Sequence, residues 1–139
     1  MKINYAYIVL ILLSFSFHAY SQNFPPEITI IGNQMYCQES SVSIATSVSI
    51  TDQNPEDTTL TEVFVQISEG YEVGQDNISL DGSHPNISSS WNATEGILVL
   101  IGPATFDEFE AAIESIVFQT TQTVFTQDRQ FSVNLCCCN

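Results

Sequence analysis

The chain has almost no positive charge, and this shortage argues against more functions than any motif in it supports. Its 139 residues contain sixteen carboxylates but only two basic side chains, Lys2 and Arg129. A surface without cations cannot neutralise phosphates, which argues against binding to DNA, RNA, nucleotides or anionic lipid headgroups. The formal net charge of −14 suits an extracellular protein kept soluble by self-repulsion, or one that uses divalent cations as counter-ions.

The groups that catalysis needs are also scarce. Outside the first 21 residues the chain has one histidine, His84, which lies between Ser83 and Pro85 in an expected turn. A catalytic nucleophile needs a base within reach, and the sequence has no G-x-S-x-G, H-E-x-x-H, C-x-x-C or Gly-rich phosphate motif. Spacing alone leaves a carboxylate pair for glycoside hydrolysis open, but one Trp and one Arg offer little to hold a sugar. We therefore expect that the protein is not an enzyme.

Residues 1–21 are typical of a secretory signal peptide. Lys2 provides a positive start, residues 6–17 form an apolar run, and Ala19-Tyr20-Ser21 is a small-x-small cleavage site. The alternative is a membrane anchor, but a spanning helix needs roughly 20 apolar residues and this run is shorter. The sequence therefore predicts a secreted or cell-surface protein that does not insert into a membrane once the signal is removed.

The cysteines do not follow a disulfide pattern. Cys37 stands alone, and three adjacent cysteines at positions 136–138 precede the last residue. The length after cleavage predicts one domain over residues 22–135 and a Cys-rich tail over 136–139 that is disordered or a truncation artefact of a longer protein. A bridge from Cys37 to one of the three tail cysteines stays open, and it would join the two ends of the domain.

Short β-rich runs alternate with turns rich in Asp, Asn, Gly and Pro. These β-rich runs predict seven strands, at residues 27–31, 41–50, 61–68, 77–80, 96–101, 116–120 and 129–135. The runs 41–50, 61–68 and 77–80 alternate polar and apolar residues, whereas 96–101 is apolar almost throughout, as expected for a strand covered on both sides or in the centre of a sandwich. Within the second run the Ala45-Thr46 step interrupts the alternation, which predicts a bulge or a strand that crosses between sheets. The spacing favours an all-β, antiparallel β-sandwich of the immunoglobulin type, with about seven strands.

One segment has helical spacing instead. Apolar side chains recur at Phe106, Phe109, Ile113 and Ile116, and acidic side chains occupy the other face at Asp107, Glu108, Glu110 and Glu114. Thr105 followed by Glu108 is a capping box. The pattern predicts one short amphipathic helix that plugs an end of the sandwich, with Phe106 and Phe109 as core anchors.

The segment from Gly96 to Phe118 (GILVLIGPATFDEFEAAIESIVF), together with Arg129-Gln-Phe131-Ser-Val133, resembles the cadherin-like and immunoglobulin-like repeats of bacterial secreted surface proteins and adhesins. Val48-Ser-Ile50-Thr-Asp52, Gly70-Tyr71 and Gln75-Asp76 are similar to earlier parts of the same repeat. The likeness covers about residues 41–134. It implies a β-sandwich module, mostly non-catalytic, that stands near the N-terminus of longer surface proteins. The repeat's first acidic pair is reduced here to Asp52-Gln53-Asn54, which weakens the implied calcium ligation.

Calcium is the one candidate cofactor. It binds six to eight oxygen ligands held in turns, and the segment from Asp52 to Asp57 supplies several within six residues. Asp52, Asn54, Asp57 and Asp76 are the predicted ligands, with Asp76 approaching from a second loop at the same end. The alternative is a solvated acidic turn, in which Asp and Asn bond to the local backbone.

Two functions remain open from the sequence. The first is a non-catalytic structural or adhesion module of a secreted or cell-surface protein. The alternative is a calcium-dependent domain that binds carbohydrate or protein. In both cases the expected partner is a protein or a glycan at the cell surface.

Overall fold

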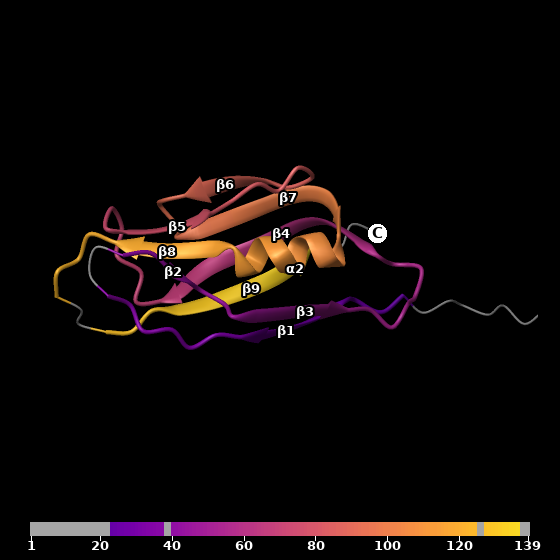
Figure 1. The fold of residues 1–139 in the computed structure, drawn as a ribbon, viewed down its shortest axis with the longest axis horizontal. Helices are drawn as coiled ribbons and strands as arrows, with labels where there is room; N and C mark the ends of the chain where they lie inside the picture. Colours follow the sequence, from indigo (N-terminus) through magenta and orange to yellow (C-terminus); the bar gives the residue numbers. More distant parts are fainter. Residues whose placement is uncertain (1–22, 38–39, 125–126, 137–139) are drawn as a thin grey trace, which may run out of the picture.

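The computed structural model describes residues 23–37, 40–124 and 127–136. This part of the chain is mostly β, with antiparallel sheets and one helix (Figure 1). The elements are β1 (Glu27–Ile31), β2 (Val42–Ser43), β3 (Ser47–Thr51), β4 (Thr59–Glu69), β5 (Asp76–Leu80), β6 (Ser88–Asn92), β7 (Ile97–Thr105), α2 (Phe106–Glu114), β8 (Ile116–Thr120) and β9 (Gln130–Cys136). The predicted all-β class is confirmed.

The strands form three antiparallel sheets in the described residues. A four-stranded sheet has the order β6-β7-β4-β9, a three-stranded sheet the order β2-β8-β5, and β1 pairs with β3. The described part of the chain has nine strands, where the sequence predicted about seven. One addition is β6, whose sequence SSSWN has little apolar content and which forms by pairing with β7. The other arises because the run 41–50 is two strands.

Of the two alternatives predicted for the Ala45-Thr46 step, a bulge or a strand crossing between sheets, the structure has the crossing. Before this step β2 pairs with β8, and after it β3 pairs with β1. Ala45 is buried at the crossing, and the backbone N–H of Thr46 donates to the carbonyl of Ile31 at 2.7 Å. The break in the polar–apolar alternation therefore marks the point at which the chain leaves one sheet for another.

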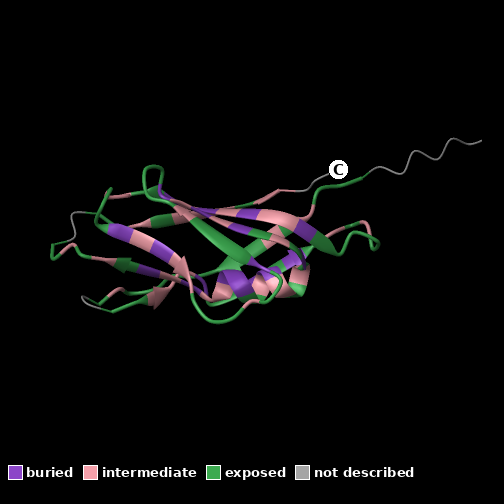
Figure 2. Ribbon diagram, turned by 90° about the horizontal axis from the view of Figure 1, so that it is seen from above, coloured by how far each residue is buried: buried purple, intermediate pink, exposed green. Residues whose placement is uncertain are grey.

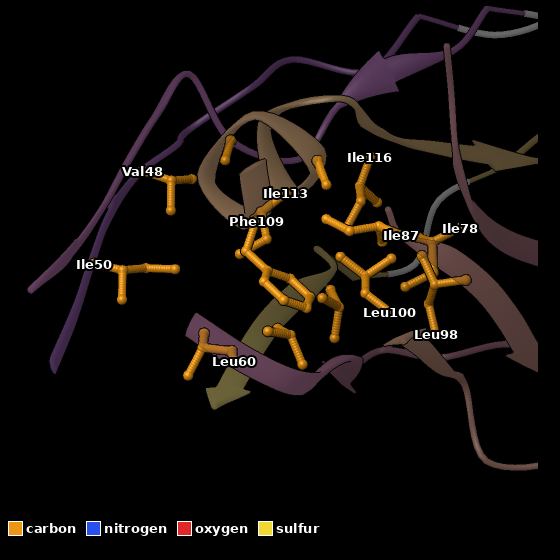
Figure 3. Packing of buried hydrophobic residues seen from close by; sticks show 14 of the residues in the cluster. Val48, Ile50, Leu60, Ile78, Ile87, Leu98, Leu100, Phe109, Ile113 and Ile116 are labelled. Carbon is orange, nitrogen blue, oxygen red and sulfur yellow. The ribbon is translucent and has the colours of Figure 1, made fainter. Parts of the chain in front are cut away.

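A single apolar core lies among the sheets and the helix (Figure 3). Each element contributes the side chains that its period directs inward. The largest fully buried side chains are Val63, Val65, Leu98 and Leu100 from the four-stranded sheet, Ile78 and Ile116 from the three-stranded sheet, and Phe109 and Ile113 from α2. Most buried residues lie on strands and helix, and the loops at both ends are mainly exposed (Figure 2).

The helix α2 begins with the predicted capping box. The N–H of Glu108 donates to Thr105 Oγ1 at 3.3 Å, and the N–H of Thr105 donates to Glu108 Oε2 at 2.8 Å. Phe109 is fully buried, as predicted, whereas Phe106 is only half-buried. The helix packs mainly against β3 along its length, so its predicted role as an end plug is wrong.

Two carboxylates of α2 bond to the backbone of β3, although the helical pattern assigned them to the face opposite the core. Glu114 Oε1 accepts the N–H of Val48 at 2.9 Å, and Glu110 Oε1 accepts the N–H of Ile50 at 2.5 Å. Four helical residues rise about 6 Å and two strand residues about 6.6 Å. The spacing of the two carboxylates therefore matches the spacing of alternate backbone N–H groups along one edge of β3. The helix therefore takes the place of a neighbouring strand.

Both ends of the described chain lie at the same end of the fold (Figure 1). Asn23 accepts a hydrogen bond from Asn54, and Cys136 pairs with Glu62 near the start of β4. We call this the proximal end. The described parts of three loops, residues 32–37 with 40–41, 70–75, and 121–124 with 127–129, meet at the other end, which we call the distal end.

Candidate functional site

The predicted calcium loop lies at the proximal end and bonds to itself. The N–H of Asn54 donates to Asp52 Oδ1 at 2.7 Å, and the Asn54 side chain donates to Asp57 Oδ2 at 3.3 Å and to Asn23 Oδ1. These are the local hydrogen bonds of an Asx-type turn. Asp52 and Asp57 also line a cavity of about 440 Å³, together with residues 23–26 and Phe106.

Asp76, the fourth predicted ligand, lies at the distal end. Its carboxylate is buried and binds Arg129, with Nε to Oδ2 at 2.6 Å and Nη2 to Oδ1 at 3.3 Å. It also accepts the N–H of Glu72 at 2.9 Å. Asp52 lies before the start of β4, and Asp76 lies beyond its end. An extended strand of 11 residues is about 33 Å long, so the two carboxylates are separated by roughly this length.

The four residues therefore do not form one calcium site, and the prediction that Asp76 joins the loop at the same end is wrong. Asp52, Asn54 and Asp57 lie together, and Asp76 is neutralised by a guanidinium instead. Within the ranges that the structure describes, no group of three or more His, Cys, Asp or Glu side chains could hold a metal ion.

The ion pair between Asp76 and Arg129 organises the distal end. Arg129 Nη1 donates to the carbonyl of Gln127 at 3.0 Å, and Nη2 donates to Gln122 Oε1 at 2.6 Å. Because Asp76 also accepts from Glu72, this cluster joins the loop after β4 to the loop after β8. Sequence reasoning assigned Arg129 to a motif and Asp76 to calcium, and the pairing of the two comes only from the fold.

A second cluster fixes the loop after β4 to the β6–β7 hairpin. Tyr71 packs edge-to-face on Trp91 with ring centroids 6.1 Å apart, and its hydroxyl donates to the carbonyl of Ala93 at 2.6 Å. The same ring lies against Gly96, whose φ is +69°. Burial raises the pKa of Tyr71 above its ordinary value, and the nearby Asp76 carboxylate adds to the rise.

Each of the three loops at the distal end carries an apolar side chain in solvent. Met35 is 91% exposed, Val73 66% and Val124 70%. Each loop has a hydrogen bond that ties it to the fold. Tyr36 Oη donates to the carbonyl of Thr120 at 3.2 Å, and the loops of Val73 and Val124 are joined to the Asp76–Arg129 pair through Glu72 and Gln122. Loops positioned by a scaffold commonly carry function, so these three side chains make the distal end a candidate binding surface. The sequence pattern gave no signal for this surface, since isolated apolar residues in loops are common.

Among the described residues Cys37 and Cys136 are free thiols, and they lie at opposite ends of the fold. Cys37 follows Tyr36 at the distal end, whereas Cys136 ends β9 opposite Glu62 at the proximal end. A seven-residue strand spans about 20 Å, far beyond the Cα separation of a disulfide. Cys136 is therefore not a partner for Cys37 and belongs to β9 rather than to a tail. The other two cysteines and the signal segment lie outside the described residues.

Among the residues that the structure covers, no helix has the length and apolar character to cross a bilayer. Comparisons with family models, with curated proteins and with solved structures find no match to this chain.

Proposed function

We propose that this protein is a non-catalytic structural or adhesion module, secreted or held at the cell surface, with an immunoglobulin- or cadherin-like β-sandwich fold. The residue patterns that resemble cadherin-like surface repeats support the fold assignment. Side chains of the four-stranded and three-stranded sheets that meet in one core support it as well. The apolar leader and the acidic composition support export.

One observation carries the proposal. Residues 23 and 136 both lie at the proximal end, so the distal end faces away from both ends of the described chain. The three loops there expose Met35, Val73 and Val124 and are fixed by an ion pair and two tyrosine contacts. A rigid module of this kind presents a protein- or glycan-binding face at a distance from its attachment.

The test is attachment of cells that produce the full chain. We expect the protein to be cleaved by protease added outside the cell, and attachment to fall by at least about tenfold when the gene is deleted. The triple variant Met35→Ser, Val73→Ser, Val124→Ser should behave like the deletion. Ile101→Ser is the matched control, because Ile101 is also exposed but lies on β7 away from the distal loops.

Treatment of the opposing surface with protease or periodate separates a protein partner from a glycan partner. Retention of the chain inside the cell, or turnover of a substrate by the purified chain, would contradict the proposal. Attachment that is unchanged by deletion would contradict it equally.

A further inference from the structure

The two larger sheets end on the same side of the molecule in edge strands that do not pair with each other. β9 is the last strand of the four-stranded sheet, and β2 is the last strand of the three-stranded sheet. A groove of about 770 Å³ lies between them, and its walls include Val42 from β2, Val133 from β9 and residues 32–36. No β4 residue lines it. The groove therefore lies along the edge of β9 that faces away from β4.

The floor of this groove is apolar and only partly covered. Phe131 and Val133 lie opposite Ile67 and Val65 of the neighbouring strand β4. Because Ile67 and Val65 are buried, the side chains of Phe131 and Val133 also point to the core face of the sheet. Phe131 and Val133 are nevertheless half-buried, as is Ile44 on the opposite wall. The side chains of an additional strand would cover this surface.

The edge of β9 lacks the charged residues and the proline that commonly discourage strand addition, and the one irregularity in its pairing with β4 lies between Ile67 and Glu69, at the start of β9. Its sequence QFSVNLC has no charge and no proline, and a strand paired on one side leaves alternate N–H and C=O groups free on the other. The same molecule protects β3 differently, because Glu110 and Glu114 occupy backbone donors of that strand. In the described residues no comparable group covers β9.

We propose that the free edge of β9 is a β-strand addition site for an extended segment of another protein. The segment would add a fifth strand to the sheet, with apolar side chains at alternate positions over the groove. It would carry basic residues at one end, because Glu69 and Asp128 are exposed where β9 begins. A net charge of −14 opposes a second copy as the occupant. This inference rests on the proposed function as an adhesion module and names the kind of partner it takes.

The test uses the full chain after signal removal and a labelled peptide of about nine residues, long enough to span β9. The peptide has two lysines at one end followed by alternating valine and threonine. We expect saturable binding by fluorescence anisotropy and slower amide exchange in β9. Two variants of the peptide, N-methylated at all valines or at all threonines, block opposite edges of the peptide. One variant should bind at least about tenfold more weakly than the other.

Charge variants test the polarity of the site. Asp128→Asn should weaken binding of the lysine peptide several-fold and leave unchanged the binding of a peptide with glutamines in place of the lysines. Asp107→Asn, an exposed carboxylate on α2, is the matched control and should have no effect. An equal response of both peptides to Asp128→Asn would overturn the charge assignment.

Several results would overturn the site itself. One is no binding at about 1 mM peptide. Another is equal binding of both N-methylated peptides. The third is slower amide exchange on peptide binding that occurs only outside β9. A stable dimer in sedimentation with protected β9 amides would assign the edge to a second copy instead. If the chain does not bind the peptide but cells that produce it attach normally, only this inference is wrong. If the chain binds the peptide but cells that produce it do not attach, the proposed function is wrong.

Discussion

At the residue scale, the Asp76 carboxylate and the Arg129 guanidinium are both removed from water, with side-chain exposures of 0% and 5%. Removing one partner of such a pair leaves an uncompensated buried charge. Asp76→Asn should therefore lower the free energy of unfolding by about 3–5 kcal/mol, measured by urea denaturation. The double variant Asp76→Leu, Arg129→Met should recover most of this loss.

The exposed neighbour Asp128 provides the control for that prediction. Asp128→Asn should change stability by less than about 0.5 kcal/mol, because the carboxylate stays in water. If Asp76→Asn were equally mild, the ion pair would not be what joins the two distal loops.

Gly96 is required by its backbone and by its neighbour together. Its φ is +69°, and an added Cβ would lie 2.9 Å from the ring of Tyr71. Gly74 has a similar φ of +79° but nothing within 4 Å of an added Cβ. Gly74→Ala should cost about 1 kcal/mol for the left-handed backbone alone. Gly96→Ala should cost clearly more, and equal losses in thermal unfolding would show that the Tyr71 contact contributes nothing.

At the element scale, the carboxylates of Glu110 and Glu114 serve as acceptors for β3. The double variant to alanine leaves two backbone donors unsatisfied, at about 1–3 kcal/mol each. We expect urea denaturation to show that loss. The double variant to glutamine keeps a side-chain carbonyl acceptor at both positions and should retain most of the stability. If both double variants lost the same amount, charge rather than hydrogen bonding would join α2 to β3.

The capping box gives the helix a dependence on acid. The backbone N–H of Thr105, and then the side chains of Asn86 and Thr105, lower the pKa of Glu108 below its ordinary value. The folded state therefore favours the carboxylate, so this stabilisation is present above the ordinary pKa of 4.5 and is lost as pH falls through the lowered value.

Thermal unfolding from about pH 6 to pH 3, a range that brackets the ordinary pKa of glutamate, checks this prediction. The wild type should lose more of its melting temperature over that range than Glu108→Gln does. Glu56→Gln, an exposed loop substitution, should follow the wild type. Parallel curves for all three proteins would contradict the role of the capping carboxylate.

At the scale of the whole molecule, the proximal and distal ends divide the predicted calcium ligands between them. Asp52, Asn54 and Asp57 supply fewer oxygens than the six to eight that calcium binds, and Asp76 is committed to Arg129. We expect the melting temperature in millimolar calcium to match that in chelator within about 1 °C. A site saturated a hundredfold above its Kd would add about 2.7 kcal/mol, a shift of several degrees. Magnesium at equal ionic strength controls for screening.

Local chemistry was enough to predict much of the fold. The strand at residues 116–120 matches β8, because its period-2 alternation reflects burial of one strand face. The strand at residues 27–31 matches β1, although most of β1 is exposed. The capping box placed the start of α2. The broken alternation at Ala45 left a bulge and a sheet crossing open, and the structure has the crossing. The strand β6 was missed because SSSWN has no apolar period of its own and forms only where β7 offers a partner.

The candidate sites depended on contacts between residues far apart in the chain. Arg129 meets Asp76 across 53 positions, and Glu114 meets Val48 across 66. No spacing rule contains such pairs, because they follow from how sheets stack and in which direction each strand runs. The sequence by itself determined the β-rich class, the helix and the acidic character, which are local or compositional properties. Only the tertiary structure decided which carboxylates are neutralised or capped, and which sheet edge stays open.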